Sequence, residues 1–249
     1  MNFKQSNTIY AYDGSFDGFL TCAFEIWTRR EMPAAFANLK DAQPVLLETF
    51  FVETDAEKAQ RVGKSILQKM GDASFNLLEE TLWTCLENKE IAMINYMRLG
   101  YKEGFKTINL IDKDAVKILT DASRFLHNEA HYFKEFIRFG KYDDLLVAKI
   151  KPKNFVLPIT SPHFTRRMPN EKFIIYDETH EWAFAYANGK SALSQVSGWT
   201  LPKAKGDEKE YQKLWKAFYN TIAVEGRTNH KCRMTHMPKR YWSNLTEFQ

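Results

Sequence analysis

The sequence is poor in cysteine, and its three cysteines stand far apart at Cys22, Cys85 and Cys232. No two of them form a Cys-x-x-Cys motif, and the odd number argues against a framework of disulfide bonds. An iron–sulfur cluster needs closely spaced thiolates, so the chain cannot hold such a cluster on its own cysteines. These features predict a protein of a reducing compartment.

Long apolar runs are also absent. No stretch approaches the roughly 18 apolar residues of a membrane-spanning helix. The first fourteen residues lack the apolar centre of a secretory signal peptide, and the chain contains no internal repeat or low-complexity tract. We therefore expect a soluble, cytoplasmic protein without a membrane partner.

Apolar and aromatic residues, by contrast, are plentiful. Hydrophobic residues make up 44% of the 249 residues, including 19 Phe, 11 Tyr and 6 Trp. A chain of this size and composition can bury a large core without disulfide or metal staples, which excludes disorder for most of its length. We predict a single domain that spans residues 1–249.

Short strands and amphipathic helices are interspersed along the chain. Strands are predicted at residues 8–12, 45–52, 145–150, 173–176 and 182–186, the last two forming a hairpin. A helix capped by Ser15 runs to Arg29, and a large helical block covers about residues 54–139. These elements predict an α+β fold, with a mixed or antiparallel sheet that carries helices.

The boundaries of several elements follow from local signals. Thr54-x-x-Glu57 has the form of a capping box at the start of the helical block, and Asp112 is suited to cap its longest helix. Prolines at 33 and 44 bracket an expected loop, and polar residues 188–207 form a candidate mobile loop. A helix over residues 211–224 would turn Leu214, Trp215 and Phe218 inward, and Pro238 would open a last short helix.

Positive charge is concentrated near the C-terminus. The net charge is +4, yet residues 226–246 contain no Asp or Glu and alone carry +5, so the rest of the chain sums to −1. Such a segment is typical of a phosphate-binding surface. The alternative is a solvated basic face that pairs with acids elsewhere in the fold. The five cations are Arg227, Lys231, Arg233, Lys239 and Arg240.

The same segment mixes cations with an amide and large rings, namely Asn229, Tyr241 and Trp242. Guanidinium groups suit bidentate phosphate contacts, and aromatic rings stack on unpaired bases. This combination favours single-stranded or locally opened DNA as the partner. Alternatively, Trp242 and Leu245 clamp the last helix to the core.

Two aspartates, Asp13 and Asp177, each follow a predicted strand and precede a turn. If the strands are neighbours, the two carboxylates meet at one sheet edge, where they could hold a divalent cation or share a proton for acid–base work. Arg138 and His163 are further catalytic candidates. The alternative is local, because Asp is a favoured turn residue that bonds nearby backbone amides.

A third candidate is the segment Ser161-Pro162-His163-Phe164-Thr165-Arg166-Arg167, which we interpret as the start of a short helix. The free amides and positive dipole end of a helix N-terminus suit a phosphate, and Arg166 and Arg167 add charge.

His127 and His131, at i and i+4 on the long helix, have the spacing of two metal ligands, although residues so spaced are also common on helix surfaces. We assign no metal and no cofactor to the chain.

Five blocks of the sequence form a pattern that spans nearly the whole chain. The N-terminal block is Tyr12-Asp13-Gly14-Ser15-Phe16-Asp17-Gly18-Phe19-Leu20. The next three are Phe136-Ile137-Arg138-Phe139, then Leu157-Pro158 with Pro162-His163-Phe164 and Arg166-Arg167, then Phe173-Ile174-Ile175-Tyr176-Asp177. The last block runs from Tyr211-Gln212-x-Leu214-Trp215-Lys216 through Arg227-x-Asn229 to Met237-Pro238-Lys239-Arg240-Tyr241-Trp242. In this order the blocks resemble a bacterial family of DNA-metabolism proteins that contain domain of unknown function 4130.

The resemblance implies a role in DNA repair or modification beside a radical-SAM protein, which would carry the iron–sulfur cluster. Two positions depart from the family pattern: His180 stands where the family has Arg, and Val224-Glu225-Gly226 precedes Arg227. The first departure weakens any role carried over to the turn after Asp177.

From the residues and the resemblance together, we expect a DNA-binding accessory protein that acts with a separate radical-SAM enzyme. Two alternatives stay open at this point. One is a DNA-processing hydrolase, nuclease-like or glycosylase-like, that uses the paired carboxylates. The other is a protein-interaction scaffold whose basic segment docks an acidic partner without contacting DNA.

Overall fold

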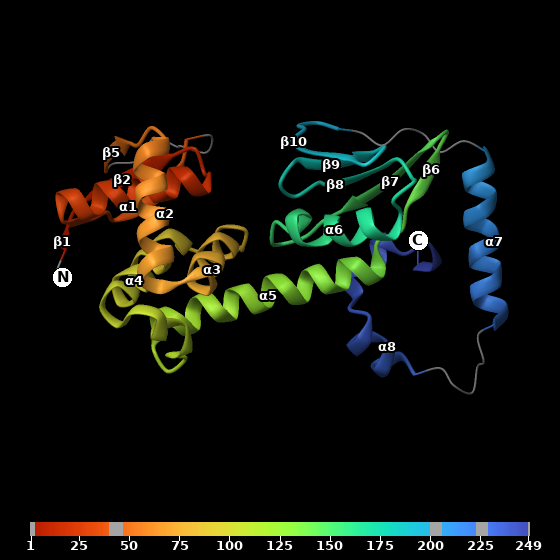
Figure 1. Ribbon diagram of the computed structural model, residues 1–249. Helices are drawn as coiled ribbons and strands as arrows, with labels where there is room; N and C mark the ends of the chain where they lie inside the picture. Colours follow the sequence, from red (N-terminus) through yellow and green to blue (C-terminus); the bar gives the residue numbers. More distant parts are fainter. Residues whose placement is uncertain (1–2, 40–46, 200–205, 223–228, 249) are drawn as a thin grey trace. The chain divides into compact units, whose positions relative to one another are not determined.

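The computed structural model describes residues 3–39, 47–199, 206–222 and 229–248 (Figure 1). The chain divides into two compact units, Met1–Phe125 and Leu126–Gln249, and each is described by itself. One helix, α5 (Asp114–Phe136), belongs to both units. The single domain expected over residues 1–249 stays a prediction, because two units that share a helix can fold together or separately.

In the first unit, a three-stranded parallel sheet has the order β4-β2-β5. Its central strand, β2 (Thr8–Tyr12), is the apolar run predicted from the sequence, and four of its five residues are buried. On its two sides lie β4 (Ala35–Asn38) and β5 (Glu48–Phe51). Two short strands, β1 (Lys4–Gln5) and β3 (Glu31–Met32), pair separately.

Two predictions for this sheet are wrong in detail. The loop expected between the prolines at 33 and 44 contains β4, since Ala-Phe-Ala-Asn adds to the edge of β2. The buried strand expected at residues 45–52 begins only at Glu48 and is partly exposed, because β5 is an edge strand. Residues 45 and 46 lie outside the described part of the chain.

Helices pack against this sheet and against one another. They are α1 (Phe16–Arg29), α2 (Ala56–Met70), α3 (Asp72–Leu82), α4 (Lys89–Glu103) and the 3-10 helix η1 (Gly104–Asn109). The Ser15 hydroxyl caps α1 by accepting from the amide of Gly18, as predicted. The cap of α2 is Asp55 and not Thr54, whose hydroxyl is used elsewhere. The start of this helix was therefore predicted one residue too early.

Helix α5 carries the predicted apolar stripe. Val116 and Leu119 are buried in the first unit, and Leu126, Ala130 and Phe133 are buried in the second. The helix begins at Asp114, so Asp112 lies outside it and forms an ion pair with Lys113.

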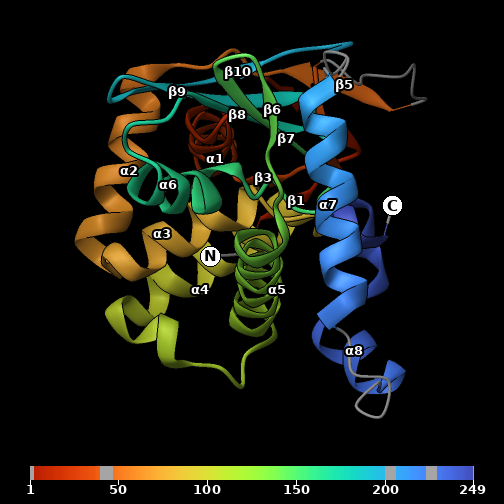
Figure 2. The same ribbon diagram turned by 90° about the vertical axis from the view of Figure 1, so that its right-hand side faces the viewer.

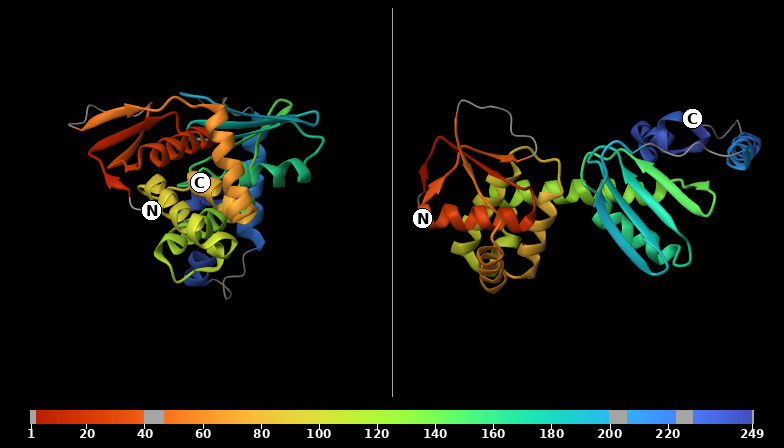
Figure 3. Two further views of the ribbon diagram at one scale, coloured as in Figure 1. Left: turned by 60° about the vertical axis from the view of Figure 1, so that its left-hand side comes forward. Right: turned by 90° about the horizontal axis from the view of Figure 1, so that it is seen from above.

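The second unit is built on a five-stranded mixed sheet of order β10-β9-β8-β7-β6, seen from above in Figure 3. Strands β7 and β8 are parallel, and all other neighbours are antiparallel. Helix α6 (Leu157–Arg167) connects β7 to β8 and packs against β8 and β9 (Figure 2). The strands are β6 (Gly140–Tyr142), β7 (Leu145–Ile150), β8 (Phe173–Asp177), β9 (Trp182–Ala187) and β10 (Lys190–Gln195).

Part of the expected mobile loop at residues 188–207 is a strand. Asn188 and Gly189, both with positive φ, form a two-residue turn, and β10 returns along β9. Asn-Gly between two strands is a strong hairpin signal. Residues 200–205 lie outside the described part of the chain.

The C-terminal part contains α7 (Gly206–Ile222), α8 (His230–His236) and the 3-10 helices η3 (Lys239–Asn244) and η4 (Thr246–Phe248). Leu214, Trp215 and Phe218 were predicted to point inward, but they are exposed on α7. The reason is that α7 lies beside the sheet-edge strand β6 and η4, which cover only part of its surface.

The fold class is α+β with a mixed sheet, as predicted, and the helical block spans residues 56–136. No helix in the described part of the chain combines the length and apolar character needed to cross a membrane.

Candidate functional site

Asp13 follows the central strand of the first unit and organises the turn into α1. Its Oδ1 accepts hydrogen bonds from the amide and the hydroxyl of Ser15, at 2.9 and 2.7 Å, and its Oδ2 accepts from the hydroxyl of Thr54 at 2.9 Å. Burial acts to raise the pKa of Asp13, but these hydrogen bonds outweigh it and hold the pKa below its ordinary value. The carboxylate therefore ties the end of β2 to the segment after β5.

Asp177 plays a similar part at the end of β8 in the second unit. The side chain is fully buried, and its Oδ1 accepts from the amides of Thr179 and His180 at 2.9 and 3.1 Å. The local alternative is thus confirmed for both aspartates, because each bonds the backbone of its own turn. Since Asp13 and Asp177 lie in different units, their pairing stays a prediction.

The buried Asp177 also contacts an imidazole. Its Oδ2 lies 2.7 Å from Nδ1 of His180, whose side chain is 29% exposed. A carboxylate oxygen accepts, so Nδ1 carries the hydrogen and Nε2 is the remaining acceptor of the neutral ring. A carboxylate that orients a histidine in this way is the arrangement used to prepare a general base.

Helix α6 begins four residues before the predicted start. Pro158 lies in its first turn, where proline is well accommodated, and the amide of Thr160 already bonds the carbonyl of Val156. Ser161 is consequently in the middle of the helix, and the phosphate site expected at a helix N-terminus there is wrong. Arg166 and Arg167 instead occupy the last turn, where cations complement the helix dipole.

These two arginines still form part of a cationic cluster, which we define as Lys134, His163, Arg166 and Arg167. Burial lowers the pKa of His163, and the charges of Lys134, Arg167 and Arg166 lower it further. The three charges that lower this pKa are all positive. Its Nε2 is buried and makes no hydrogen bond within the described residues, which leaves a protected polar atom beside three cations from α5 and α6.

Arg240, predicted to bind DNA, forms an ion pair within the protein. Its Nη2 donates to Oε1 of Glu129, a buried carboxylate on α5. Glu129 also accepts from the amides of Lys153 and Asn154 and from the side chain of Asn154. Arg240 thus compensates a buried negative charge, which corresponds to the internal-pairing alternative for this part of the basic segment.

Tyr241 was expected to contact a displaced base, but only 2% of it is exposed. Its ring packs against Tyr132, Phe133 and Phe136 of α5, with centroids 5.1–5.7 Å apart. Burial raises the pKa of Tyr241 to about 12. The ring is a core element and is not available to stack on a base.

Trp242 belongs to a small cluster with other C-terminal residues. Its indole N–H donates to the carbonyl of Met237, and its ring stacks on Phe248 at 4.5 Å. The Arg233 guanidinium lies 5.7 Å and 5.5 Å from the centres of these two rings. This supports the alternative in which Trp242 anchors the C-terminal helices.

The remaining residues of the basic segment differ in exposure. Asn229 caps α8 by accepting from the amide of Cys232, while Lys231 and Lys239 are exposed. The ammonium of Lys239 lies 5.9 Å from the centre of the Trp242 ring. Arg227 lies outside the described residues.

Arg138 lines a cavity of about 350 Å³ between β6, β7 and α7. Its guanidinium donates to the carbonyl of Glu135 at 3.0 Å and lies 3.8 Å from Glu247. Within the described lining, Lys149 and Lys151 both pair with Glu178, and hydrogen bonds from these lysines lower the pKa of that carboxyl. Neither Asp177 nor His163 lines the cavity, so the catalytic candidates of the second unit do not share it.

His127 and His131 are exposed on α5, and His131 pairs with Glu135 at 3.1 Å. In the part of the chain that the structure describes, no group of three potential ligand side chains has the arrangement of a metal site.

The sequence did not indicate His180, Lys134 or Glu129 as site residues. His180 was noted only as a departure from the family pattern, although it stands three residues after Asp177, within reach of an Asp-anchored turn. Lys134 and Glu129 become relevant only when α5 is placed beside α6 and the C-terminal segment, and no local signal marks them.

Comparison with known proteins gives one family. No curated protein matches the chain. The model of a domain of unknown function, DUF4130, matches residues 87–247, which is more than half of the sequence and covers the whole second unit except its last two residues. The N-terminal block around Asp13 lies outside this match. The chain belongs to the DUF4130 family.

Proposed function

We propose that this protein binds nucleic acid through the cationic cluster and acts as an accessory factor in DNA repair or modification. The observation that carries the proposal is the grouping of three cations, Lys134, Arg166 and Arg167, around His163, whose buried Nε2 makes no hydrogen bond within the described residues. Burial lowers the pKa of this imidazole, and the three charges lower it further. A polyanion supplies the missing negative charge.

The exposure of the arginines supports this role. Arg166 and Arg167 are both exposed, and neither forms an ion pair with a described residue. Exposed guanidinium groups form bidentate hydrogen bonds with phosphate oxygens. Contacts of this kind are independent of base sequence and release counterions, so they give a salt-dependent affinity.

The experiment is a DNA-binding titration followed by fluorescence anisotropy at several salt concentrations. The double variant Arg166→Ala/Arg167→Ala should weaken binding about tenfold and reduce the slope of log affinity against log salt by about 1.8 on duplex DNA, since each phosphate contact contributes about 0.9. The matched control, Lys117→Ala/Arg124→Ala, removes two exposed charges from α5.

The control should retain most of the affinity. Equal losses of DNA affinity in the two double variants would mean that net charge, and not the cationic cluster, determines binding. Unchanged affinity in both variants would contradict the proposed nucleic-acid role. Binding to an acidic protein that persists after nuclease treatment and in high salt would instead favour the scaffold alternative.

Partnership with a radical-SAM enzyme rests on the family resemblance. In that arrangement the partner performs the chemistry, and this chain holds the DNA. Co-purification with the radical-SAM protein encoded nearest to it, with and without nuclease, tests the partnership. Failure to associate in the presence of DNA contradicts it.

The Asp177–His180 contact favours a second candidate function, a hydrolase in which His180 acts as general base. The buried carboxylate fixes the tautomer and leaves Nε2 to take a proton from water. This candidate replaces the paired carboxylates of the sequence-based hypothesis with a carboxylate–imidazole pair.

Turnover of damaged or modified DNA would test this candidate. His180→Gln should abolish turnover while leaving DNA affinity unchanged, and His131→Gln, at an exposed histidine, is the control. If neither metal nor chelator reveals turnover across a broad panel of substrates, the hydrolase is excluded and the binding role stands alone.

A further inference from the structure

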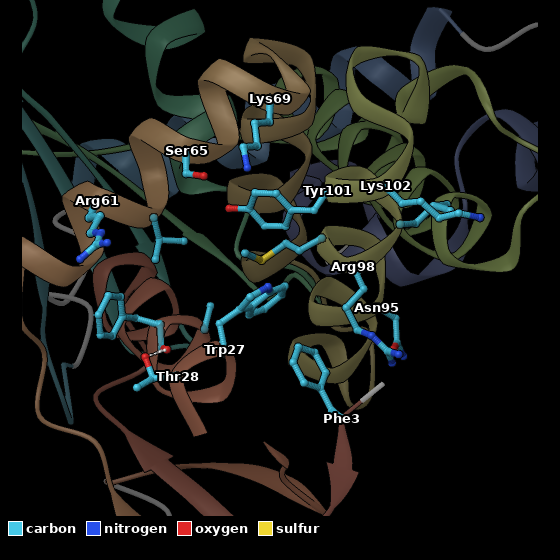
Figure 4. Close-up of a pocket in the computed structure, with 15 residues that line it drawn as sticks. Phe3, Trp27, Thr28, Arg61, Ser65, Lys69, Asn95, Arg98, Tyr101 and Lys102 are labelled. Carbon is cyan, nitrogen blue, oxygen red and sulfur yellow. Dashed lines mark hydrogen bonds between the residues drawn. The ribbon is translucent and has the colours of Figure 1, made fainter. Parts of the chain in front are cut away.

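The first unit contains a cavity of about 1080 Å³ that none of the functions above uses. It lies between α1, α2 and α4, with Phe3 of the N-terminal segment at its edge (Figure 4). Drug-sized and cofactor-sized ligands occupy cavities of about 300–1,000 Å³. The space is therefore sufficient for a ligand such as a mononucleotide.

Helical spacing directs one row of side chains into this cavity. Arg61, Ser65 and Lys69 stand at i, i+4 and i+8 on α2, so they share one face of the helix. Asn95, Arg98 and Tyr101 form a comparable row on α4. Two opposed helices thus each supply a hydrogen-bonding side chain and at least one cation.

The lining is cationic and contains no acid. Arg61, Lys69, Arg98 and Lys102 contribute to it, and none of the 15 described lining residues is Asp or Glu. Lys102 points away from the cavity in Figure 4 and pairs with Glu103. The other three cations therefore define the charge of the cavity, which favours an anionic ligand.

Aromatic rings accompany these cations. Trp27 is half-buried in the middle of the lining, and the rings of Phe3 and Tyr101 contact it edge-on, with centroids 5.2 and 5.6 Å away. Lys69 lies 5.4 Å from the centre of the Tyr101 ring, and Arg98 lies 5.0 Å from that of Phe3. Lys69 and Arg98 thus each lie beside an aromatic ring.

The lining also includes four apolar side chains, which are those of Ala23, Val62, Met97 and Leu99. A simple inorganic anion would gain nothing from these groups or from Trp27. A planar aromatic ring that carries a phosphate would use both parts of the lining, because rings stack on bases and cations pair with phosphate.

We propose that this cavity is a nucleotide-binding site, in which the base packs against Trp27 and Lys69 pairs with the phosphate, while Arg61 and Arg98 add positive charge on the two sides of the cavity. The ligand is either a free nucleoside monophosphate or the phosphorylated terminal nucleotide of a strand. The proposal does not depend on the cationic cluster of the second unit.

The test is calorimetric titration of the full chain with the four deoxynucleoside monophosphates. At least one should bind saturably, about tenfold more tightly than its nucleoside or than 2-deoxyribose 5-phosphate, since stacking and charged hydrogen bonds each contribute about a factor of ten. Absence of saturable binding in the millimolar range overturns the proposal, as does equal affinity for the sugar phosphate alone.

Substitutions in the lining test whether the nucleotide binds in this cavity. Lys69→Met should weaken nucleotide binding about tenfold, whereas Lys64→Met, an exposed residue of the same helix outside the lining, should not. Both positions are exposed, so neither change threatens folding. Trp27→Phe keeps an aromatic ring in the packing and should weaken only the part of the nucleotide affinity that comes from the base. Equal affinities in Lys64→Met and Lys69→Met contradict the assignment.

Competition with short oligonucleotides separates the two sources of ligand. Displacement by a 5′-phosphorylated trinucleotide, and not by its 5′-hydroxyl form, identifies a strand end, while failure of both identifies a free nucleotide. Arg166→Ala/Arg167→Ala should leave mononucleotide affinity unchanged, so failure of this site and failure of the nucleic-acid surface are distinguishable.

Discussion

Arg240 of η3 pairs with Glu129 of α5 although 111 positions separate them in the sequence. Glu129 is buried and receives further hydrogen bonds from Lys153 and Asn154. One carboxylate therefore joins the long helix, the turn after β7 and the C-terminal segment. A cation that the sequence assigned to a DNA surface instead stabilises the core of the second unit.

Replacing this cation should reduce stability without affecting DNA binding. Arg240→Ala leaves the Glu129 carboxylate buried and unpaired, so we expect a loss of about 2 kcal/mol in the free energy of unfolding, below the usual cost for a fully buried pair because Arg240 is one-third exposed. Urea unfolding measures the change. Lys231→Ala, an exposed neighbour in the segment, should change the value by less than about 0.5 kcal/mol.

DNA affinity provides the second readout for Arg240→Ala. The folded variant should bind within about twofold of the original protein, since the guanidinium is already engaged. A tenfold loss of DNA affinity at unchanged stability would contradict this prediction and show that Arg240 contacts nucleic acid.

His163 should couple DNA binding to pH. Burial and then Lys134, Arg167 and Arg166 hold the pKa of His163 below its ordinary value of 6.5. Bound phosphate would screen these cations and raise the pKa of His163. By linkage, DNA binding then takes up a proton, so the affinity increases as pH falls below 6.5 toward the lowered pKa.

The stability of the chain without DNA should change with pH in the opposite sense. Its unfolded state takes up the proton first, so the stability contributed by neutral His163 is present above pH 6.5 and is lost as pH falls.

Titration by NMR of the labelled imidazole, with and without DNA, measures the pKa directly. His163→Gln should remove the extra pH dependence of affinity, whereas His131→Gln should retain it. A His163 pKa that does not move when DNA binds would place the nucleic acid away from the cluster.

Asp177 should contribute to stability through its turn. Asp177→Asn loses the charge that strengthens bonds from Thr179, His180 and the imidazole, so unfolding should become easier by about 1–3 kcal/mol. Thermal or urea unfolding measures the loss, with Asp144→Asn as an exposed control. An unchanged midpoint in Asp177→Asn would mean that the turn does not depend on the carboxylate charge.

Elements with a strong periodic signal were predictable from the sequence. Strands β2 and β7, helix α1, the hairpin of β8 and β9 and the buried stripe of α5 all have an apolar pattern that matches their secondary structure. Strand β10 has no such pattern, because all six of its residues are exposed and only the Asn188-Gly189 turn marks it. Its polar sequence was therefore interpreted as a loop.

Long-range pairing limited the prediction of the candidate sites. The turn roles of Asp13 and Asp177 were foreseeable, because they use neighbouring backbone amides. The Glu129–Arg240 pair and the cavity of the first unit depend on which helix faces which, and spacing along the chain does not determine this. The row Arg61, Ser65 and Lys69 is visible in the sequence, but the facing rings of α1 and α4 are not.

Gly18 should be required for the Asp13 turn. A Cβ at this position would lie 2.3 Å from Oδ1 of Asp13, 2.9 Å from the Tyr12 ring and 3.0 Å from the Thr54 hydroxyl. Gly18→Ala must therefore displace the carboxylate that joins β2 to the segment after β5. We expect the free energy of unfolding to fall by about 1–3 kcal/mol, although alanine favours helix.

Gly63→Ala is the matched control in α2, where the atom nearest to the new Cβ would be 3.4 Å away. Helix propensity should leave the stability of this variant equal to that of the original protein or higher by up to about 1 kcal/mol. Urea unfolding of both variants decides the matter, because a Gly18→Ala protein as stable as Gly63→Ala would show that the Asp13 hydrogen bonds adjust without cost.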